Sequence, residues 1–221
     1  MTPSLAERLR SATRELHTEV ERAGLMRRLL RGDLPRPAYC ALLRSLHAIY
    51  AALEAALQRH AGHPAIAPWM HPELLRRERL EHDLQALHGA DWAAIPCAPA
   101  AQRYAAHLQV LSDERPGLLA AHGYVRYLGD LSGGQALARV VTRSLGAEQA
   151  VAFYDFGGPE AAGRLAMALR AGLDRMAPDA PSAQALVEEA VAAFVRHREL
   201  FEELERDALG AGPTLLQAAA R

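Results

Sequence analysis

The chain has 221 residues, of which 50% are hydrophobic and 23% charged, and its formal net charge at pH 7 is -1. This composition is typical of one globular domain, and the balanced charge excludes the broad basic field of a nucleic-acid-binding protein. With only Cys40 and Cys97, no CxxC pair, no secretory signal and no uncharged run of 18 apolar residues, the sequence predicts a cytoplasmic protein without a membrane span.

Apolar residues recur at spacings of three and four along almost the whole chain, which favours helices over strands. We therefore expect an all-α fold, a single compact multi-helix domain over 1–221 with a loosely ordered tail from about 209. Breaks rich in glycine and proline separate the helices, and none is long enough for an interdomain linker. The expected helices are 4–22, 36–60, 72–87, 98–113, 116–146, 159–176 and 182–208, with short turns near 25–31 and 147–154.

The first predicted helix carries a row of functional side chains, namely Arg10, Arg14, His17 and Glu21. At about 100° per residue their spacing places them in a stripe roughly 60° wide on one helix face. A lone histidine is more often an ordinary side chain than a ligand, but this one lies between two guanidinium groups and a carboxylate. That order suits an iron porphyrin, with His17 on the iron, the arginines near the propionates and Glu21 available to the other ring nitrogen.

Two other kinds of metal site receive less support from the sequence. His60, His63 and His71 lie in or beside one loop and could bind zinc, but their spacing is not that of a standard finger and no cysteine joins them. A di-iron helical bundle needs two Glu-x-x-His units, and the sequence contains none.

The segment 123–141 reads GYVRYLGDLSGGQALARVV, and its LSGGQ matches the signature peptide of transporter-type ATPases. Nucleotide hydrolysis would need a GxxxxGK[ST] loop, whose lysine reaches the β and γ phosphates. All 25 basic residues of this chain are arginines, so that lysine is missing. The helical pattern also predicts no βαβ alternation, and the ATPase interpretation is rejected.

Gly129, Gly133 and Gly134 fall in the middle of this long predicted helix, where each costs roughly 1 kcal/mol relative to alanine. Three glycines so close together either allow another helix to pack very closely or allow a bend and the approach of backbone to a flat ligand. Both interpretations remain open on the glycines alone.

Polar residues surround these glycines. Arg126 and Asp130 are spaced i, i+4 and could form an ordinary surface ion pair. Alternatively, with Tyr124 and Tyr127 they bring two phenols, a guanidinium and a carboxylate to a face opened by glycine, where they could hold ordered water beside a ligand.

With these residues in view, the sequence resembles the haem oxygenase family over most of its length. The motifs occur in the family's order: LxxATxELHTxxE around His17, an APxxxPELxR-like stretch at 67–76, QRY at 102–104, YxRYLGDLSGGQ at 124–135, and VEEAxxAFxxxxxLFEEL at 187–204. The glycine-containing motif is the most specific of them.

The resemblance implies haem sandwiched between a proximal N-terminal helix and a glycine-bent distal helix. His17 would be the neutral axial ligand of the iron, and Gly129, Gly133 and Gly134 would let the distal helix lie close to the ring. Asp130 would be the essential distal residue, acting through water.

The resemblance also implies the residues around that centre. Arg126 and Tyr50 would belong to the water network of Asp130, while Arg10, Arg14, Tyr124 and Arg170 would lie near the propionates. The family's mammalian forms have lysines where Arg10 and Arg14 stand, and another where this chain has Ala166, so the basic rim differs in detail.

The implied activity is cleavage of haem at a meso carbon to biliverdin, iron and carbon monoxide, with haem as cofactor and substrate and molecular oxygen as co-substrate. Electrons would come from an external donor such as ferredoxin or a flavin reductase, meeting a basic edge near Arg10, Arg14 and the arginines of 76–79, unless those arginines are merely a solvated face. The alternatives are a non-catalytic haem carrier or sensor using the same pocket, and a helical interaction module without haem affinity.

Overall fold

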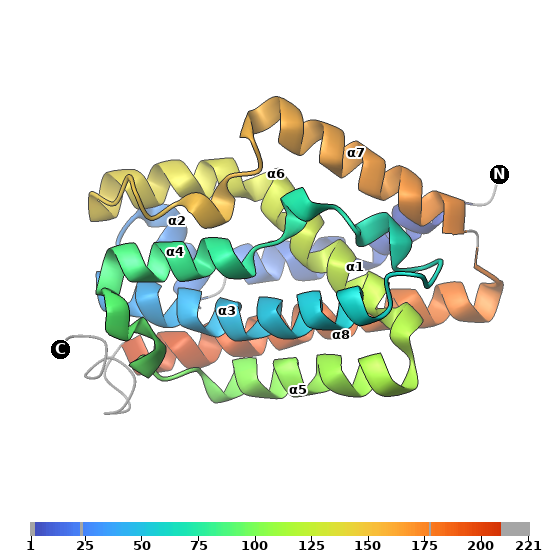
Figure 1. The fold of residues 1–221 in the computed structure, drawn as a ribbon, viewed down its shortest axis with the longest axis horizontal. Coiled ribbons are helices and arrows are strands. Elements are labelled where there is room, and N and C mark those ends of the chain that lie inside the picture. Colours follow the sequence, from blue (N-terminus) through green and yellow to red (C-terminus); the bar gives the residue numbers. More distant parts are fainter. Residues whose placement is uncertain (1–2, 23, 177, 209–221) are drawn as a thin grey trace.

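The computed structural model describes residues 3–22, 24–176 and 178–208, and within these ranges it consists of helices and loops without a strand (Figure 1). This confirms the all-α prediction. The α-helices are α1 (Leu5–Arg22), α2 (Gly24–Arg31), α3 (Arg36–Arg59), α4 (Arg77–His88), α5 (Pro99–Glu114), α6 (Leu119–Leu145), α7 (Gly158–Met176) and α8 (Ala180–Ala208). Short 3-10 turns are η1 (Ala67–Trp69), η2 (Pro72–Leu74), η3 (Ala90–Ala94), η4 (Pro116–Leu118) and η5 (Ala152–Tyr154).

The predicted element boundaries needed three corrections. The turn expected near 25–31 is helix α2, because Leu25 and Leu29, one helical turn apart, are both buried. The helix expected over 72–87 is two elements, since Leu75 is extended (φ -63°, ψ 124°) between η2 and α4. The helix expected from 116 begins with the separate turn η4. The predicted loose tail from 209 lies outside the described residues.

Helix α3 forms the centre of the core, packed against α4 and α5 (Figure 1). It is the one described helix that is long and apolar enough to cross a membrane, but 61% of its most apolar window is buried inside the protein. Residues such as Leu43, Ile49 and Leu53 have no exposed surface at all. The apolar character of α3 is thus accounted for by the core.

Helix α6 is not straight: its ribbon changes direction in mid-course (Figure 1). Gly129, Ser132, Gly133 and Gly134 occupy the middle of the helix, and glycine–serine pairs are common sites of helix bends. The helix ends where Gly146 adopts the left-handed conformation (φ 61°) that L-residues with a Cβ avoid.

The packing of α6 places it opposite the N-terminal helix. Helix α6 contacts α7 and α8, and α1 also contacts both of these helices. Helices α7 and α8 therefore bridge α1 and α6, and the space between α1 and α6 is where the candidate site lies.

Candidate functional site

A pocket of about 650 Å³ lies between α1 and α6, with α7 and one residue of α8 completing its wall. Its position is the one predicted from the two sequence constellations on the first and the glycine-containing helix. The residues lining it are Ser4, Ala6, Glu7, Arg10, Thr13, Arg14, His17, Thr18, Tyr124, Val125, Leu128, Gly129, Ser132, Arg170, Asp174 and Phe194.

The α1 wall carries the predicted row of side chains. Arg10, Arg14 and His17 all line the pocket, so the helical spacing read from the sequence does place them on one face. The side chain of His17 is 52% exposed, and its ring meets Phe194 edge-on at 5.9 Å between centroids. Glu21 is outside the lining, but its carboxylate lies 3.6 Å from His17 Nδ1. His17 Nε2 is thus the nitrogen left to serve as a ligand.

The α6 wall is opened by glycine. A Cβ built on Gly129 or on Gly133 would meet no atom within 4 Å, and Gly129 itself lines the pocket. Helix packing against neighbouring protein therefore does not explain these two glycines. Space kept free of side-chain atoms along a helix face suits the close approach of a flat ligand.

Gly134 has a different environment from Gly129 and Gly133. A Cβ there would lie 3.4 Å from the ring of Tyr154, in the protein interior, and Gly134 is not among the pocket residues. A contact at 3.4 Å is an ordinary van der Waals contact, so close packing does not require a glycine at this position. Gly129 and Gly133 therefore have free space beside them, whereas Gly134 lies beside Tyr154.

Behind the pocket wall lies a buried polar network built around Asp130. Tyr50 on α3 donates a hydrogen bond to Asp130 Oδ2, and Arg126 approaches Asp130 Oδ1 at 3.5 Å. Arg126 Nε also donates to the hydroxyl of Tyr50 at 3.1 Å. The side chains of Arg126 and Asp130 are only 10% and 12% exposed, which rejects the surface ion-pair interpretation.

His197 on α8 is the fourth member of this network, and sequence reasoning missed it. Its Nδ1–H donates to the carbonyl of Ala193 at 3.0 Å, so its Nε2 accepts a hydrogen bond from Arg126. Burial, and then the charge of Arg126, lower the pKa of His197 well below its usual value, and the ring is neutral. Its place one helical turn after Ala193, on the apolar face of the predicted last helix, was the signal available in the sequence.

Burial and the neighbouring polar groups have opposite effects on the pKa of Asp130. Burial raises the pKa of Asp130, although Arg126 and the hydrogen bond from Tyr50 act to lower it. Burial also raises the pKa of Tyr50 well above its usual value, so the phenol keeps its proton and remains a donor. A buried carboxyl group with a raised pKa, held beside a guanidinium group, is a candidate for proton transfer.

The remaining predicted residues are distributed as follows. Tyr124 and Arg170 line the pocket, on α6 and α7. The Tyr124 hydroxyl lies 3.5 Å from that of Thr13, which links the α6 wall to α1. Ser132, Thr13 and Phe194 also line the pocket and were not singled out from the sequence, where nothing distinguishes them from ordinary helix residues.

The structure removes Arg76 from the predicted basic docking edge, while Arg77 and Arg79 are exposed, and among the described residues it does not support a zinc site in the His60 loop. Arg76 is buried, with its guanidinium 3.9 Å from the Phe156 ring and donating to backbone carbonyls of Phe153 and Asp155, so it cannot belong to a basic docking edge. His60 is paired with Ser112, and the ring of His63 accepts from a backbone N–H. In the ranges that the structure describes, the His60 loop does not form a group of three metal ligands.

The pocket has the features that haem requires. It offers one imidazole for the iron, three guanidinium groups for propionates, and apolar contacts from Val125, Leu128 and Phe194 for the ring. The free space beside Gly129 lies across from the α1 wall.

Comparisons with known proteins agree with this geometry. The family model of heme oxygenase matches residues 3–203. Heme oxygenase 1 of Nostoc sp. is 34% identical over 208 residues, covering 93% of this chain and 87% of the relative, and heme oxygenase 1 of Homo sapiens is 37% identical over 210 residues, covering 93% and 73%.

Solved structures are similar over nearly the whole fold. The crystal structure of heme oxygenase-1 from Synechocystis sp., in complex with heme, superposes with a TM-score of 0.89 at 31% identity and covers 95% of this chain and 96% of that one. Heme oxygenase-2 from the same organism, in complex with heme and NO, gives a TM-score of 0.88 at 33% identity, covering 99% and 93%. The chain therefore belongs to the haem oxygenase family, the enzymes that use oxygen and electrons to cleave haem at a meso carbon to biliverdin, iron and carbon monoxide.

Proposed function

We propose that haem, cofactor and substrate of the reaction, binds in the pocket between α1 and α6 with the imidazole of His17 as the axial ligand of its iron. The observation that carries this proposal is that His17 and Gly129 line the same pocket. The imidazole of His17 can bind a metal ion, and the absence of a side chain at Gly129 leaves space for a flat ring. Bound haem supplies the site at which oxygen is activated. Orientation of the ring and delivery of protons fall to residues of this chain.

We assign the orientation of the ring to the arginines that line the pocket, which are together called the rim. Arg10 and Arg14 on α1 and Arg170 on α7 line the pocket, and guanidinium groups pair well with carboxylates. Tyr124 adds a hydroxyl near the same rim. These contacts would fix the rotation of the ring, and hence which meso carbon faces the distal residues. Ala166, where the family's mammalian forms carry a lysine, is buried in α7 and cannot contribute to the rim.

Proton delivery is assigned to Asp130. Tyr50 and Arg126 hold its carboxyl group in place, and burial raises its pKa. A carboxyl group fixed in this way can exchange protons with the pocket through water. Gly129 and Gly133, one turn of α6 apart, have no Cβ and would let the α6 backbone lie close to the ring. A haem carrier or sensor would have no use for such a buried proton-exchanging group.

The electrons are proposed to come from a separate protein, a ferredoxin or a flavin reductase. Supporting this is the exposed rim at the pocket mouth, where Arg10, Arg14 and Arg170 all remain accessible and would attract an acidic partner. The free thiols of Cys40 and Cys97 are consistent with a reducing, cytoplasmic compartment.

The test of this assignment is an absorbance time course of the purified protein with one equivalent of hemin, in air, with catalase present. After ascorbate or a ferredoxin and reductase system is added, the Soret band should decay while a biliverdin band grows. A Soret spectrum that persists under both donors would point instead to a carrier or sensor. If adding hemin caused no Soret shift at all, the assignment of the pocket would be wrong.

A further inference from the structure

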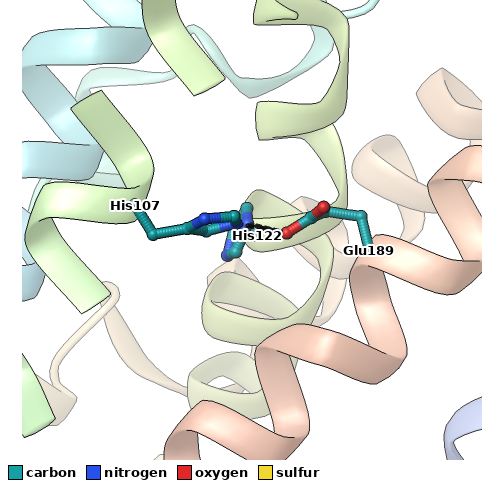
Figure 2. Close-up of side chains that lie close together, drawn as sticks. All are labelled: His107, His122 and Glu189. Carbon is teal, nitrogen blue, oxygen red and sulfur yellow. Dashed lines mark hydrogen bonds and ion pairs between the residues drawn. The ribbon is translucent and has the colours of Figure 1, made fainter. Parts of the chain in front are cut away.

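A second cluster of metal-ligand side chains lies outside the haem pocket, where three helices meet. His107 on α5, His122 on α6 and Glu189 on α8 point toward one another (Figure 2). One ligand atom from each lies within 4.8 Å of the other two. None of the three lines the haem pocket, and the haem oxygenase reaction as assigned above does not use them.

The two imidazoles converge on a single carboxylate oxygen. His107 Nε2 lies 2.7 Å and His122 Nε2 lies 3.0 Å from the same atom, Glu189 Oε1. Ligands of a tetrahedral Zn²⁺ ion, each about 2.0–2.2 Å from the metal, lie about 3.3 Å from one another. The two nitrogen–oxygen distances would therefore need to lengthen by only a few tenths of an ångström to admit an ion, and the two imidazole nitrogens already lie within 4.8 Å of each other.

The second nitrogen of His122 is already supported. Its Nδ1 lies 2.8 Å from the hydroxyl of Tyr104, a group that can either donate or accept a hydrogen bond. When a metal takes Nε2, the ring proton must be on Nδ1, and Tyr104 can then accept it. Histidine ligands in metal sites commonly have such an outer partner, which fixes the ring and its tautomer.

Burial and charge also suit a cation. His122 is fully buried, while the side chains of His107 and Glu189 are 23% and 13% exposed, so an ion can enter from the His107 side. Burial acts to lower the pKa of His122, which favours the neutral imidazole that a metal needs. Glu189 is held ionised by the two imidazoles, with a pKa of about 2 despite its burial.

We propose that His107, His122 and Glu189 form a binding site for a divalent transition-metal ion, Zn²⁺ or one of similar ligand preference, that ties α5, α6 and α8 together. Two imidazole nitrogens and one carboxylate select such ions over Mg²⁺ and Ca²⁺, which prefer oxygen ligands. The fourth position of the ion faces the partly open side and takes water. His122 lies one helical turn before Arg126 on α6, so the ion fixes the part of α6 that leads into the Asp130 network.

The site can be tested by equilibrium dialysis of the full chain against micromolar Zn²⁺, with bound metal counted by mass spectrometry. One equivalent of zinc is expected, with or without haem, and Mg²⁺ should not compete. His107→Gln and Glu189→Gln should each weaken zinc binding at least tenfold. The double variant His63→Gln, His71→Gln, which alters the other histidine-rich part of the chain, should bind as the parent does.

A second measurement separates a helix-linking site from loose surface binding. Saturating zinc should raise the melting temperature of the parent protein by about 5 °C or more, and that of Glu189→Gln by much less. The proposal is overturned if the parent binds less than half an equivalent, if the His107 and Glu189 variants bind zinc as well as the parent, or if binding is lost in the His63 and His71 variant. None of these readouts depends on haem turnover, so failure here and failure of the proposed function are distinguishable.

Discussion

Tyr50 donates a hydrogen bond to Asp130 although the two residues are 80 positions apart, one on α3 and the other in the middle of α6. This bond joins the core helix to the segment of α6 that carries the glycines. Arg126 bonds to both residues, so the carboxyl group of Asp130 is held from two sides. The position of the proposed proton donor thus depends on the packing of α6 against α3.

Replacing Asp130 by alanine should slow biliverdin formation by about 100-fold or more, the usual contribution of general acid–base catalysis. Haem binding should persist, because Asp130 does not line the pocket. The measurement is single-turnover decay of the Soret band with ascorbate. Asp113→Ala, which removes an exposed carboxylate on α5, is the control and should react as the parent does. Normal biliverdin formation by the Asp130 variant would contradict the assignment.

His17→Ala should remove the axial ligand of the iron. The expected result is a shifted ferric Soret spectrum with loss of turnover, since no other histidine lines the pocket. Added imidazole should occupy the vacated space and restore the parent spectrum at least in part. His88→Ala, at the end of α4, should leave the spectrum unchanged. A parent-like spectrum in the His17 variant would show that another group binds the iron.

Gly129→Ala should raise the stability of the haem-free protein and lower its haem affinity or turnover. Because the added Cβ meets no atom, the haem-free protein should gain up to about 1 kcal/mol from helix propensity, a rise in melting temperature of about 2–4 °C. Haem affinity or turnover should fall, since the methyl group enters the space proposed for the ring.

The matched control is Gly123→Ala on the same helix. There the new Cβ would lie 2.8 Å from the ring of Trp69, which is buried, and overpacking of this kind typically costs about 1–3 kcal/mol. Thermal unfolding of both variants without haem gives the comparison. A Gly129 variant that is less stable without haem, or that binds and turns over haem normally, would remove the argument for a ligand at this glycine.

Arg170→Ala should change which biliverdin isomers form. Loss of one rim guanidinium lets the ring adopt more than one rotation, so chromatography of the product should show a mixture. Stability should change by less than about 0.5 kcal/mol, because Arg170 is exposed. Arg175→Ala, also exposed and on α7 but outside the pocket lining, should leave the isomer ratio unchanged. An unchanged ratio in both variants would exclude Arg170 from orienting the ring.

His197 should make the protein sensitive to acid. Its pKa is lowered in the folded state by burial and by Arg126, so the unfolded chain takes up the proton first as the pH falls. Its contribution to stability is thus complete above the unfolded value near pH 6.5 and is lost below it, by up to about 1.4 kcal/mol per pH unit. Denaturant unfolding from pH 7 to 5 should show a smaller loss of stability for His197→Asn than for the parent. Parallel curves would indicate that the pKa of His197 is the same in the folded and the unfolded chain.

Local patterns in the sequence were sufficient for much of this protein. The spacing of apolar residues predicted the helices, and the spacing of Arg10, Arg14 and His17 placed them on one face, because helix geometry is set within a few residues. Errors occurred where a local pattern was too short to decide, as in α2, or where an extended residue such as Leu75 interrupted a helical pattern.

The tertiary structure decided everything that depends on contacts between distant helices. Only packing distinguishes Gly129, which faces free space, from Gly134, which lies beside Tyr154, since both are helical glycines in the same motif. His197 joined Arg126, and His107 joined Glu189, across 71 and 82 positions. Such pairings produce no periodic pattern in the sequence. They arise when whole helices pack together and bury polar groups, which then need hydrogen-bond partners from other helices.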